Sequence, residues 1–273
     1  MAELARMAIN QATTRPQYTL EQAIAAYARA GVRAIGVWRD KLAECGAARA
    51  RALLAQHGMT ASSLCRAGNF AQTDAARRRR ALAENRAAIA EAQAIGAACL
   101  VIVAGGLPAG SRDLAGARAM VADGLAELLP EARAAGVTLA VEPLHPMYAA
   151  DRCCINTLPQ AIQLCDALGP GVGIAVDVYH LWWDPDLLTQ IGRAGRRVVA
   201  FHVCDWLATT KDLLLDRGMM GDGVADIRAI AAAVEAAGYR GPIEVEIFSR
   251  DNWWKRPGEE VVQVSVERFR DCV

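Results

Sequence analysis

Residues 173–177, GIAVD, form a short apolar run that ends in an acid. Runs of this kind, separated by longer helical stretches, are typical of buried strands in a parallel sheet. Seven further runs are predicted as strands, at 7–10, 34–38, 60–65, 99–103, 138–142, 198–203 and 243–247. The 273-residue chain therefore has eight candidate strands spread along its length.

The segments between these runs have the apolar spacing of helices, as in residues 20–28. Three of them end in Ala-Gly before the next strand, and Gly31, Gly136 and Gly238 fit helix C-cap positions. Strands that alternate with helices predict parallel pairing. Our first interpretation is an α/β fold, a single (β/α)8 TIM-barrel domain over residues 1–273. An open doubly wound sheet is the second.

Composition bears on the class of partner. The 30 basic and 30 acidic residues cancel, so we expect no nucleic acid held by phosphate neutralisation. No apolar run reaches the ~18 residues that a membrane helix needs, and the first residues lack a signal-peptide core. We therefore expect a cytoplasmic protein without membrane contact. Its eight cysteines contain no Cys-x-x-Cys pair and are expected to be reduced thiols.

Two local clusters each have two interpretations. The run from Arg77 to Arg80 lies in a predicted helix over 73–95 and is interpreted as a solvated face. A phosphate or nucleic-acid site is the alternative. The adjacent Cys153 and Cys154 are interpreted as two packed thiols, with a redox pair as the alternative.

Charged or imidazole side chains lie at the ends of four consecutive strands: Glu142, Asp177, His202 and Glu246. In a barrel these ends converge on one mouth. Carboxylates brought so close repel each other, so a divalent cation is their natural partner. Three carboxylates and one imidazole form a ligand set that suits Mn²⁺, with Mg²⁺ or Co²⁺ as alternatives. A structural zinc site would instead be rich in thiolates. Each residue alone could instead be a salt-bridged or capping side chain.

More polar and aromatic groups follow the same strands. His145 and His180 come just after strands five and six, whereas His57 precedes a glycine at a predicted helix end. Aromatic side chains after strands six to eight could line a sugar site or pack on the barrel rim. They are Trp182, Trp183, Trp206, Trp253 and Trp254.

Two further acids lie close in sequence to these strand-end residues. Glu244 comes two residues before Glu246, so it points to the same side, one layer deeper. It either supports a ligand from behind or forms a buried salt bridge. Asp205 follows His202 and could orient a ligand, bind substrate or serve a structural role.

Several motifs together carry a family resemblance. They are Val141-Glu142-Pro143, Asp177-x-x-His180, Phe201-His202-Val203, Gly221-Asp222-Gly223, and Gly241 followed five residues later by Glu246. With them the chain resembles the xylose-isomerase-like (β/α)8 barrels of the sugar phosphate isomerase/epimerase group. This group includes ketose 3-epimerases, inosose isomerases and dehydratases and, more distantly, the apurinic endonuclease barrel.

The resemblance implies roles for these residues. Glu142, Asp177, His202 and Glu246 would be the metal ligands. Glu142 and Glu246 would also be the catalytic proton-transfer pair, and His180 would bind substrate.

Two departures from the family pattern affect the substrate. Ketose 3-epimerases have an arginine six residues after the strand-seven histidine, where this chain has Ala208. Arg217 could supply a guanidinium instead, and we add Arg217, Trp183 and Asp205 to the expected substrate-binding residues. The segment Asp216-Arg217-Gly218 lacks the histidine of the endonuclease metal pair, so a phosphodiesterase is not expected.

The resemblance and the strand-end set together predict a metal-dependent isomerase or epimerase of a sugar or polyol ketone. The reaction would begin with removal of the α-proton to give an enediolate. A keto-sugar lyase or dehydratase is the alternative, in which a catalytic His145 could protonate the leaving oxygen. A non-catalytic barrel that binds a ligand or partner is a third class. A barrel that had lost its catalytic function should also have lost one of the four metal-binding residues, and all four are present. The sequence does not decide the oligomeric state. If the protein forms a homo-oligomer, an exposed Trp253-Trp254 loop could lie at its interface.

Overall fold

Eight parallel strands close into a barrel in the computed structural model of the chain, which describes residues 4–273. The spatial order is β1-β10-β7-β6-β5-β4-β3-β2, which confirms the closed barrel and excludes the open sheet. The barrel strands are β1 (Met7–Asn10), β2 (Ala34–Trp38), β3 (Thr60–Gly68), β4 (Cys99–Val103), β5 (Thr138–Val141), β6 (Val172–Asp177), β7 (Val198–Val203) and β10 (Ile243–Val245).

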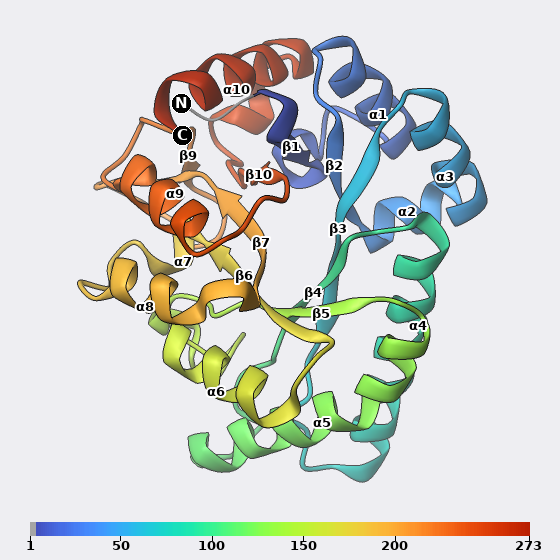
Figure 1. Cartoon of the computed structure of the whole chain (residues 1–273), viewed down its shortest axis with the longest axis vertical. Coiled ribbons are helices and arrows are strands. Elements are labelled where there is room, and N and C mark those ends of the chain that lie inside the picture. The colour runs from blue at the N-terminus through green and yellow to red at the C-terminus, as the bar shows by residue number, and fades with distance from the viewer. Residues whose placement is uncertain (1–3) are drawn as a thin grey trace.

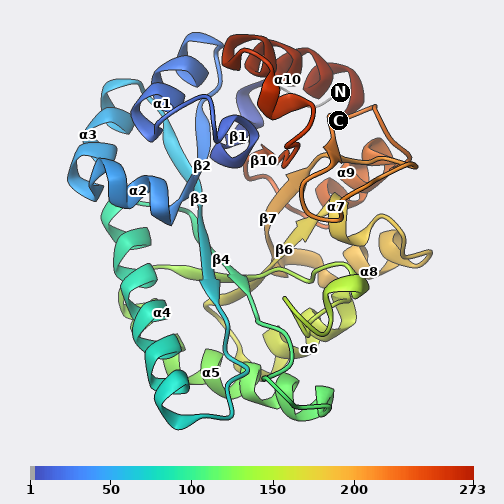
Figure 2. The same ribbon diagram turned by 180° about the vertical axis from the view of Figure 1, so that it is seen from behind.

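Helices surround the barrel on the outside, as Figures 1 and 2 show from opposite sides. The predicted C-cap glycines Gly31, Gly136 and Gly238 all have positive φ, which ends the preceding helices without steric cost. The α-helices are α1 (Leu20–Arg29), α2 (Arg39–Cys45), α3 (Ala47–Gln56), α4 (Ala75–Ile95), α5 (Leu114–Ala134), α6 (Leu158–Leu168), α7 (Val178–Leu181), α8 (Leu187–Ala194), α9 (Ile227–Ala236) and α10 (Gly258–Cys272).

Strand β3 extends three residues beyond its predicted end at Cys65. Ala67 and Gly68 still pair with Ile102 and Val103 of β4. A Cβ on Gly68 would lie 1.9 Å from the carbonyl oxygen of Val103, so only glycine allows this close approach. A second difference is a short antiparallel pair, β8 (Asp205–Trp206) and β9 (Arg217–Gly218), which the sequence did not predict.

The two-residue period of the strands sets the layers inside the barrel. Cys99, Ala140, Ala175 and Ala200 form one small, buried apolar cluster. The three alanines each precede a strand-end polar residue by two positions, so that residue lies on the same face, one layer nearer the mouth. Small side chains below therefore support a polar layer above.

The cysteines and the hydropathy of the helices bear on two further expectations. Cys153 and Cys154 are buried free thiols, in line with packed residues, and all eight cysteines are free. Within residues 4–273, no helix has both the length and the hydropathy required to cross a membrane.

Candidate metal centre and active site

The structure brings together the four strand-end residues expected as metal ligands. Glu142, Asp177, His202 and Glu246 each place one ligand atom so that all four lie within 4.8 Å of one another. All four side chains are buried. The backbone N–H of Glu142 donates to Ile102, so Glu142 continues the β5 ladder by one residue.

One imidazole nitrogen of His202 faces this cluster. Its Nδ1 lies 3.1 Å from Glu142 Oε1 and 4.0 Å from Glu246 Oε2. Burial alone would lower the pKa of His202, but Glu244, Glu142 and Glu246 raise it to about 10. Both ring nitrogens of His202 therefore face carboxylates: Nδ1 faces Glu142 and Glu246, and Nε2 faces Glu244.

A raised pKa has the opposite consequence for Glu246, because it favours the neutral form of a carboxyl group. Burial raises its pKa to about 8; Glu142 and Asp177 add to this rise, whereas Arg217 and His202 oppose it. Burial and the neighbouring carboxylates thus both disfavour the charged form of Glu246. Three carboxylates and one imidazole converging on a buried point fit a divalent cation.

Arg217 lies in this site, as the sequence suggested, and β9 positions it there. Its Nη1 donates to Asp177 Oδ2 at 3.2 Å and to Glu246 Oε2 at 3.1 Å. The guanidinium stacks 4.2 Å from the Tyr179 ring centroid and 4.8 Å from that of Phe248. These contacts fix a fully buried cation at the edge of the candidate metal centre.

Glu244 occupies the layer beneath the cluster, as its spacing from Glu246 predicts. Its carboxylate accepts hydrogen bonds from Asn10 Nδ2 (2.6 Å), Ser62 Oγ (2.6 Å) and Ser63 Oγ (3.0 Å). It also lies 3.7 Å from His202 Nε2, a buried nitrogen that has no hydrogen-bond partner in the described structure.

Gly36 of β2 makes room for this buried carboxylate. A Cβ at this position would lie 2.1 Å from Glu244 Oε1 and 2.8 Å from Asn10 Nδ2. Trp38, two residues further along the strand, donates its indole N–H to Asn10 Oδ1 at 2.7 Å. The first two strands thus build the support behind His202.

A cavity of about 450 Å³ opens above these residues. Glu142, Glu246, His180 and Arg217 line it, which brings four of the predicted catalytic and substrate-binding residues to one space. His180 is buried, and burial lowers its pKa to about 3, so its ring is neutral near pH 7. A neutral imidazole beside a guanidinium suits the binding of substrate oxygens.

Two of the residues expected at the site, His145 and Trp183, lie outside the lining of this cavity because the loops turn their side chains elsewhere. His145 does not line the cavity: its ring stacks on Trp206 with centroids 4.9 Å apart, and its Nδ1 accepts the N–H of Met147. Trp183 packs edge-on against His145 and donates its indole N–H to the carbonyl of His180. The structural reason for favouring a lyase is therefore lost.

Asp205, also expected among the substrate-binding residues, contacts loop backbone in the structure. Its buried carboxylate accepts backbone N–H groups of Trp206, Gly221 and Ala225, so it holds the loop that carries β9. Trp253, expected in an exposed loop, is only 5% exposed.

The neighbour of Trp253 is also less exposed than expected. Trp254 is partly buried and donates its indole N–H to the carbonyl of Ala12. The argument for an oligomer interface at this loop therefore fails. His57 is the C-cap residue of α3, which agrees with the helix end predicted there.

Three residues around the site were missed: Asn10, Trp38 and Arg66. Asn10 ends β1, Trp38 ends β2 and Arg66 lies near the end of β3. The rule that identified the metal cluster, polar or aromatic groups at strand ends, applies to these strands as well.

Comparisons with known proteins agree with this architecture. The family model described as "Xylose isomerase-like TIM barrel" matches residues 24–272. Among curated proteins, the L-ribulose-5-phosphate 3-epimerase UlaE of Salmonella paratyphi C (strain RKS4594) is 29% identical over 144 residues. The match includes 52% of this chain and 46% of that protein, so the chain spans about half the length of the curated relatives it matches.

Two solved structures are similar over nearly the whole chain. Protein SMc04130 from Sinorhizobium meliloti 1021 is 54% identical with a TM-score of 0.97, covering 99% of both chains. The IolI protein, whose structure contains a zinc atom, is 20% identical with a TM-score of 0.86, covering 98% of both chains. The likeness to IolI shows the shared fold.

Proposed function

Because the chain belongs to the xylose isomerase-like TIM-barrel family, we propose that it is a divalent-metal-dependent isomerase or epimerase of a sugar or polyol ketone. The observation that carries this proposal is the convergence of Glu142, Asp177, His202 and Glu246, whose ligand atoms lie within 4.8 Å of one another. The named activity of the UlaE relative, epimerisation of a ketose phosphate, supports the same reaction class.

Glu142, Asp177, His202 and Glu246 would hold the metal. We propose Mn²⁺ first, because hard oxygen donors dominate the set, and Mg²⁺ or Co²⁺ as alternatives. The zinc atom in the IolI relative adds Zn²⁺ to the ions worth testing. When bound, the cation supplies Lewis acidity that stabilises negative charge developing on substrate oxygens.

The chain's own residues would move the proton and orient the substrate. Glu142 and Glu246 both line the cavity, so one can take the α-proton and the other can return a proton. Return from the opposite face yields an epimer, and return to the neighbouring carbon yields an isomer. Arg217 and neutral His180 would bind the remaining substrate oxygens.

The finer assignments follow from the same site. A small-molecule sugar fits the 450 Å³ cavity, and a chain of zero net charge does not favour a nucleic-acid partner. We place the enzyme in the cytoplasm, where its eight thiols stay reduced.

The test is turnover of a panel of ketoses, ketose phosphates and inososes by the Mn²⁺-loaded protein, followed by proton NMR. We expect an EDTA-sensitive new epimer or isomer. Glu246→Gln should lower kcat by ~10²–10⁴-fold because it removes a proton-transfer group. Glu259→Gln, an exposed change on α10, is the matched control and should leave kcat unchanged. Turnover that resists EDTA, or full activity of Glu246→Gln, would overturn the proposal.

A further inference from the structure

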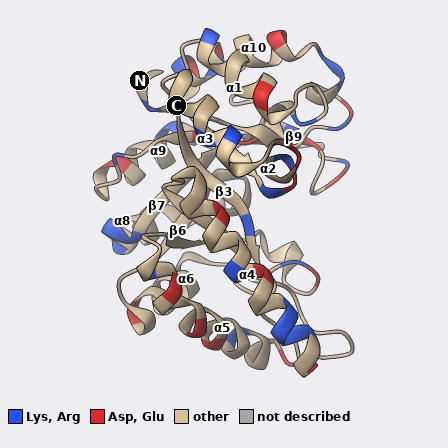
Figure 3. Ribbon diagram, turned by 90° about the vertical axis from the view of Figure 1, so that its right-hand side faces the viewer, with Lys and Arg blue, Asp and Glu red and all other residues tan. Residues whose placement is uncertain are grey.

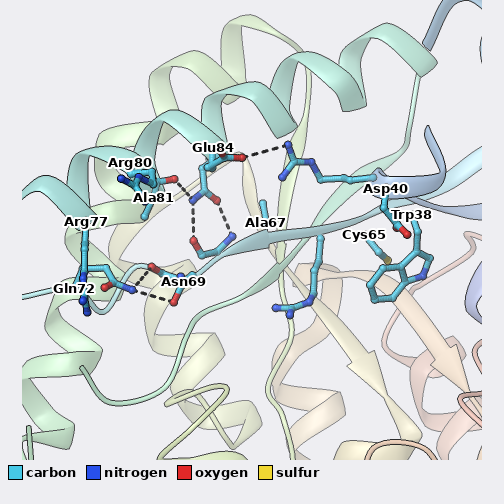
Figure 4. Close-up of a pocket in the computed structure, with 14 residues that line it drawn as sticks. Trp38, Asp40, Cys65, Ala67, Asn69, Gln72, Arg77, Arg80, Ala81 and Glu84 are labelled. Atoms are coloured by element: carbon cyan, nitrogen blue, oxygen red, sulfur yellow. Dashed lines mark hydrogen bonds and ion pairs between the residues drawn. The ribbon is translucent and has the colours of Figure 1, made fainter. Parts of the chain in front are cut away.

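A second cavity, of about 520 Å³, lies between α2, β3 and α4. It shares Trp38, Cys65, Arg66 and Asn69 with the cavity above the metal cluster. Figure 4 shows residues of this second cavity, with Gln72 and Arg77 at one end and Trp38 at the other. The two cavities are therefore adjoining compartments of the same barrel mouth, with Arg66 in the wall that both of them share.

The second compartment carries positive charge that the described residues leave uncompensated. Arg66, Arg77 and Arg80 line it, and none of their side chains has a hydrogen bond or ion pair in residues 4–273. Of its two acids, Asp40 pairs with Arg15, and the largely exposed Glu84 lies 3.9 Å from Arg39, a fourth lining arginine that is bonded to Glu91. Figure 3 shows the basic residues near the start of α4. Three free guanidiniums thus face one cavity in a chain without net charge.

The arrangement of these arginines follows from the helix and the strand that carry them. Arg77 and Arg80 are three residues apart on α4 and so share one face of the helix. Arg79, between them, does not line the cavity. The opposite wall is the backbone of β3, which Asn85 of α4 holds in place. The Asn85 side chain accepts the N–H of Gly68 and donates to its carbonyl. Free arginines therefore lie against an anchored backbone.

We propose that this compartment binds the phosphate group of a phosphorylated sugar whose ketone end reacts at the metal centre. The inference rests on the proposed function and narrows its substrate to a ketose phosphate. Guanidinium groups bind phosphate oxygens through paired, charge-assisted hydrogen bonds. Three guanidiniums match a dianionic phosphate monoester better than a singly charged carboxylate. Arg66 is the one arginine that lines both compartments, so it would contact the phosphate nearest the sugar.

The first experiment measures binding without turnover. Inorganic phosphate is titrated into EDTA-treated protein at constant ionic strength and followed by calorimetry. Arg66→Ala should raise the phosphate Kd at least ~10-fold, the effect of losing one charge-assisted hydrogen-bonding group. The Arg77→Ala/Arg80→Ala double variant should do the same. Arg79→Ala, on the same helix but outside the cavity, is the matched control and should stay within about twofold.

The second experiment measures selectivity. Wild type should have a higher kcat/KM for a ketose phosphate than for the free ketose, and Arg66→Ala should reduce that ratio at least ~10-fold. Phosphate binding at Arg66 without any turnover would support the subsite and refute the proposed function. Three results would each overturn the subsite. They are turnover with no preference for the ketose phosphate over the free ketose, no phosphate binding by wild type, and acetate binding as tight as phosphate binding.

Discussion

Replacing Glu244 with glutamine probes how the barrel interior supports the metal centre. The side chain keeps its size, so it still fits the space that Gly36 leaves open. It loses the negative charge that faces His202 Nε2 at 3.7 Å. A histidine that binds a metal through Nδ1 carries its proton on Nε2, and a carboxylate there fixes the ring orientation and strengthens the ligand.

The expected loss follows from that role. Removing such a supporting carboxylate typically weakens metal binding 10–100-fold, which is ~1.4–2.7 kcal/mol. Glu244→Gln should therefore raise the Mn²⁺ Kd by about that factor, measured by competition with a fluorescent chelator. Ser62→Ala is the matched control because it removes a donor to Glu244 and leaves the His202 contact in place. An unchanged Kd for Glu244→Gln, with lowered thermal stability only, would refute the reasoning.

Three further predictions concern packing, thiols and metal. Gly36→Ala should destabilise the fold by ~1–3 kcal/mol in urea unfolding, because the new methyl group meets Glu244 at 2.1 Å; unchanged stability would contradict the packing. Ellman's reagent should react in the native protein only with Cys45 and Cys272, the two partly exposed thiols, and with all eight in denaturant. Mn²⁺ at 100 times its Kd should stabilise the fold by ~2.7 kcal/mol in a thermal shift assay, and EDTA should abolish the gain; a metal-independent melting temperature would contradict a resident cation.

The cluster of candidate metal ligands could be predicted from sequence because a charge inside an apolar strand is costly and therefore informative. Glu142 and Asp177 each end a run of buried residues, and the two-residue period fixes the side to which they point. The same reasoning located Glu244 one layer deeper. The end of β3 could not be predicted this way, because Arg66 and Gly68 are typical of a loop.

Side-chain directions beyond the strand ends are harder to predict from sequence. His145, Trp183 and Asp205 follow strands closely in sequence, yet their side chains pack among aromatic rings or hold loop backbone. The direction of a loop side chain depends on the loop's own hydrogen bonds, which no strand period encodes. Arg217 was suggested from the missing arginine at Ala208, but its position depends on the short β8–β9 pair.

The central claim is that this barrel removes a proton from the carbon next to a ketone, with Glu246 as one of the groups that transfer it. The most direct measurement is deuterium incorporation from D₂O into a ketose phosphate, followed by proton NMR with Mn²⁺-loaded protein. The account predicts deuterium at that carbon with wild type, and none with Glu246→Gln or after EDTA treatment. Product formation without deuterium incorporation, or equal incorporation by Glu246→Gln, would contradict it.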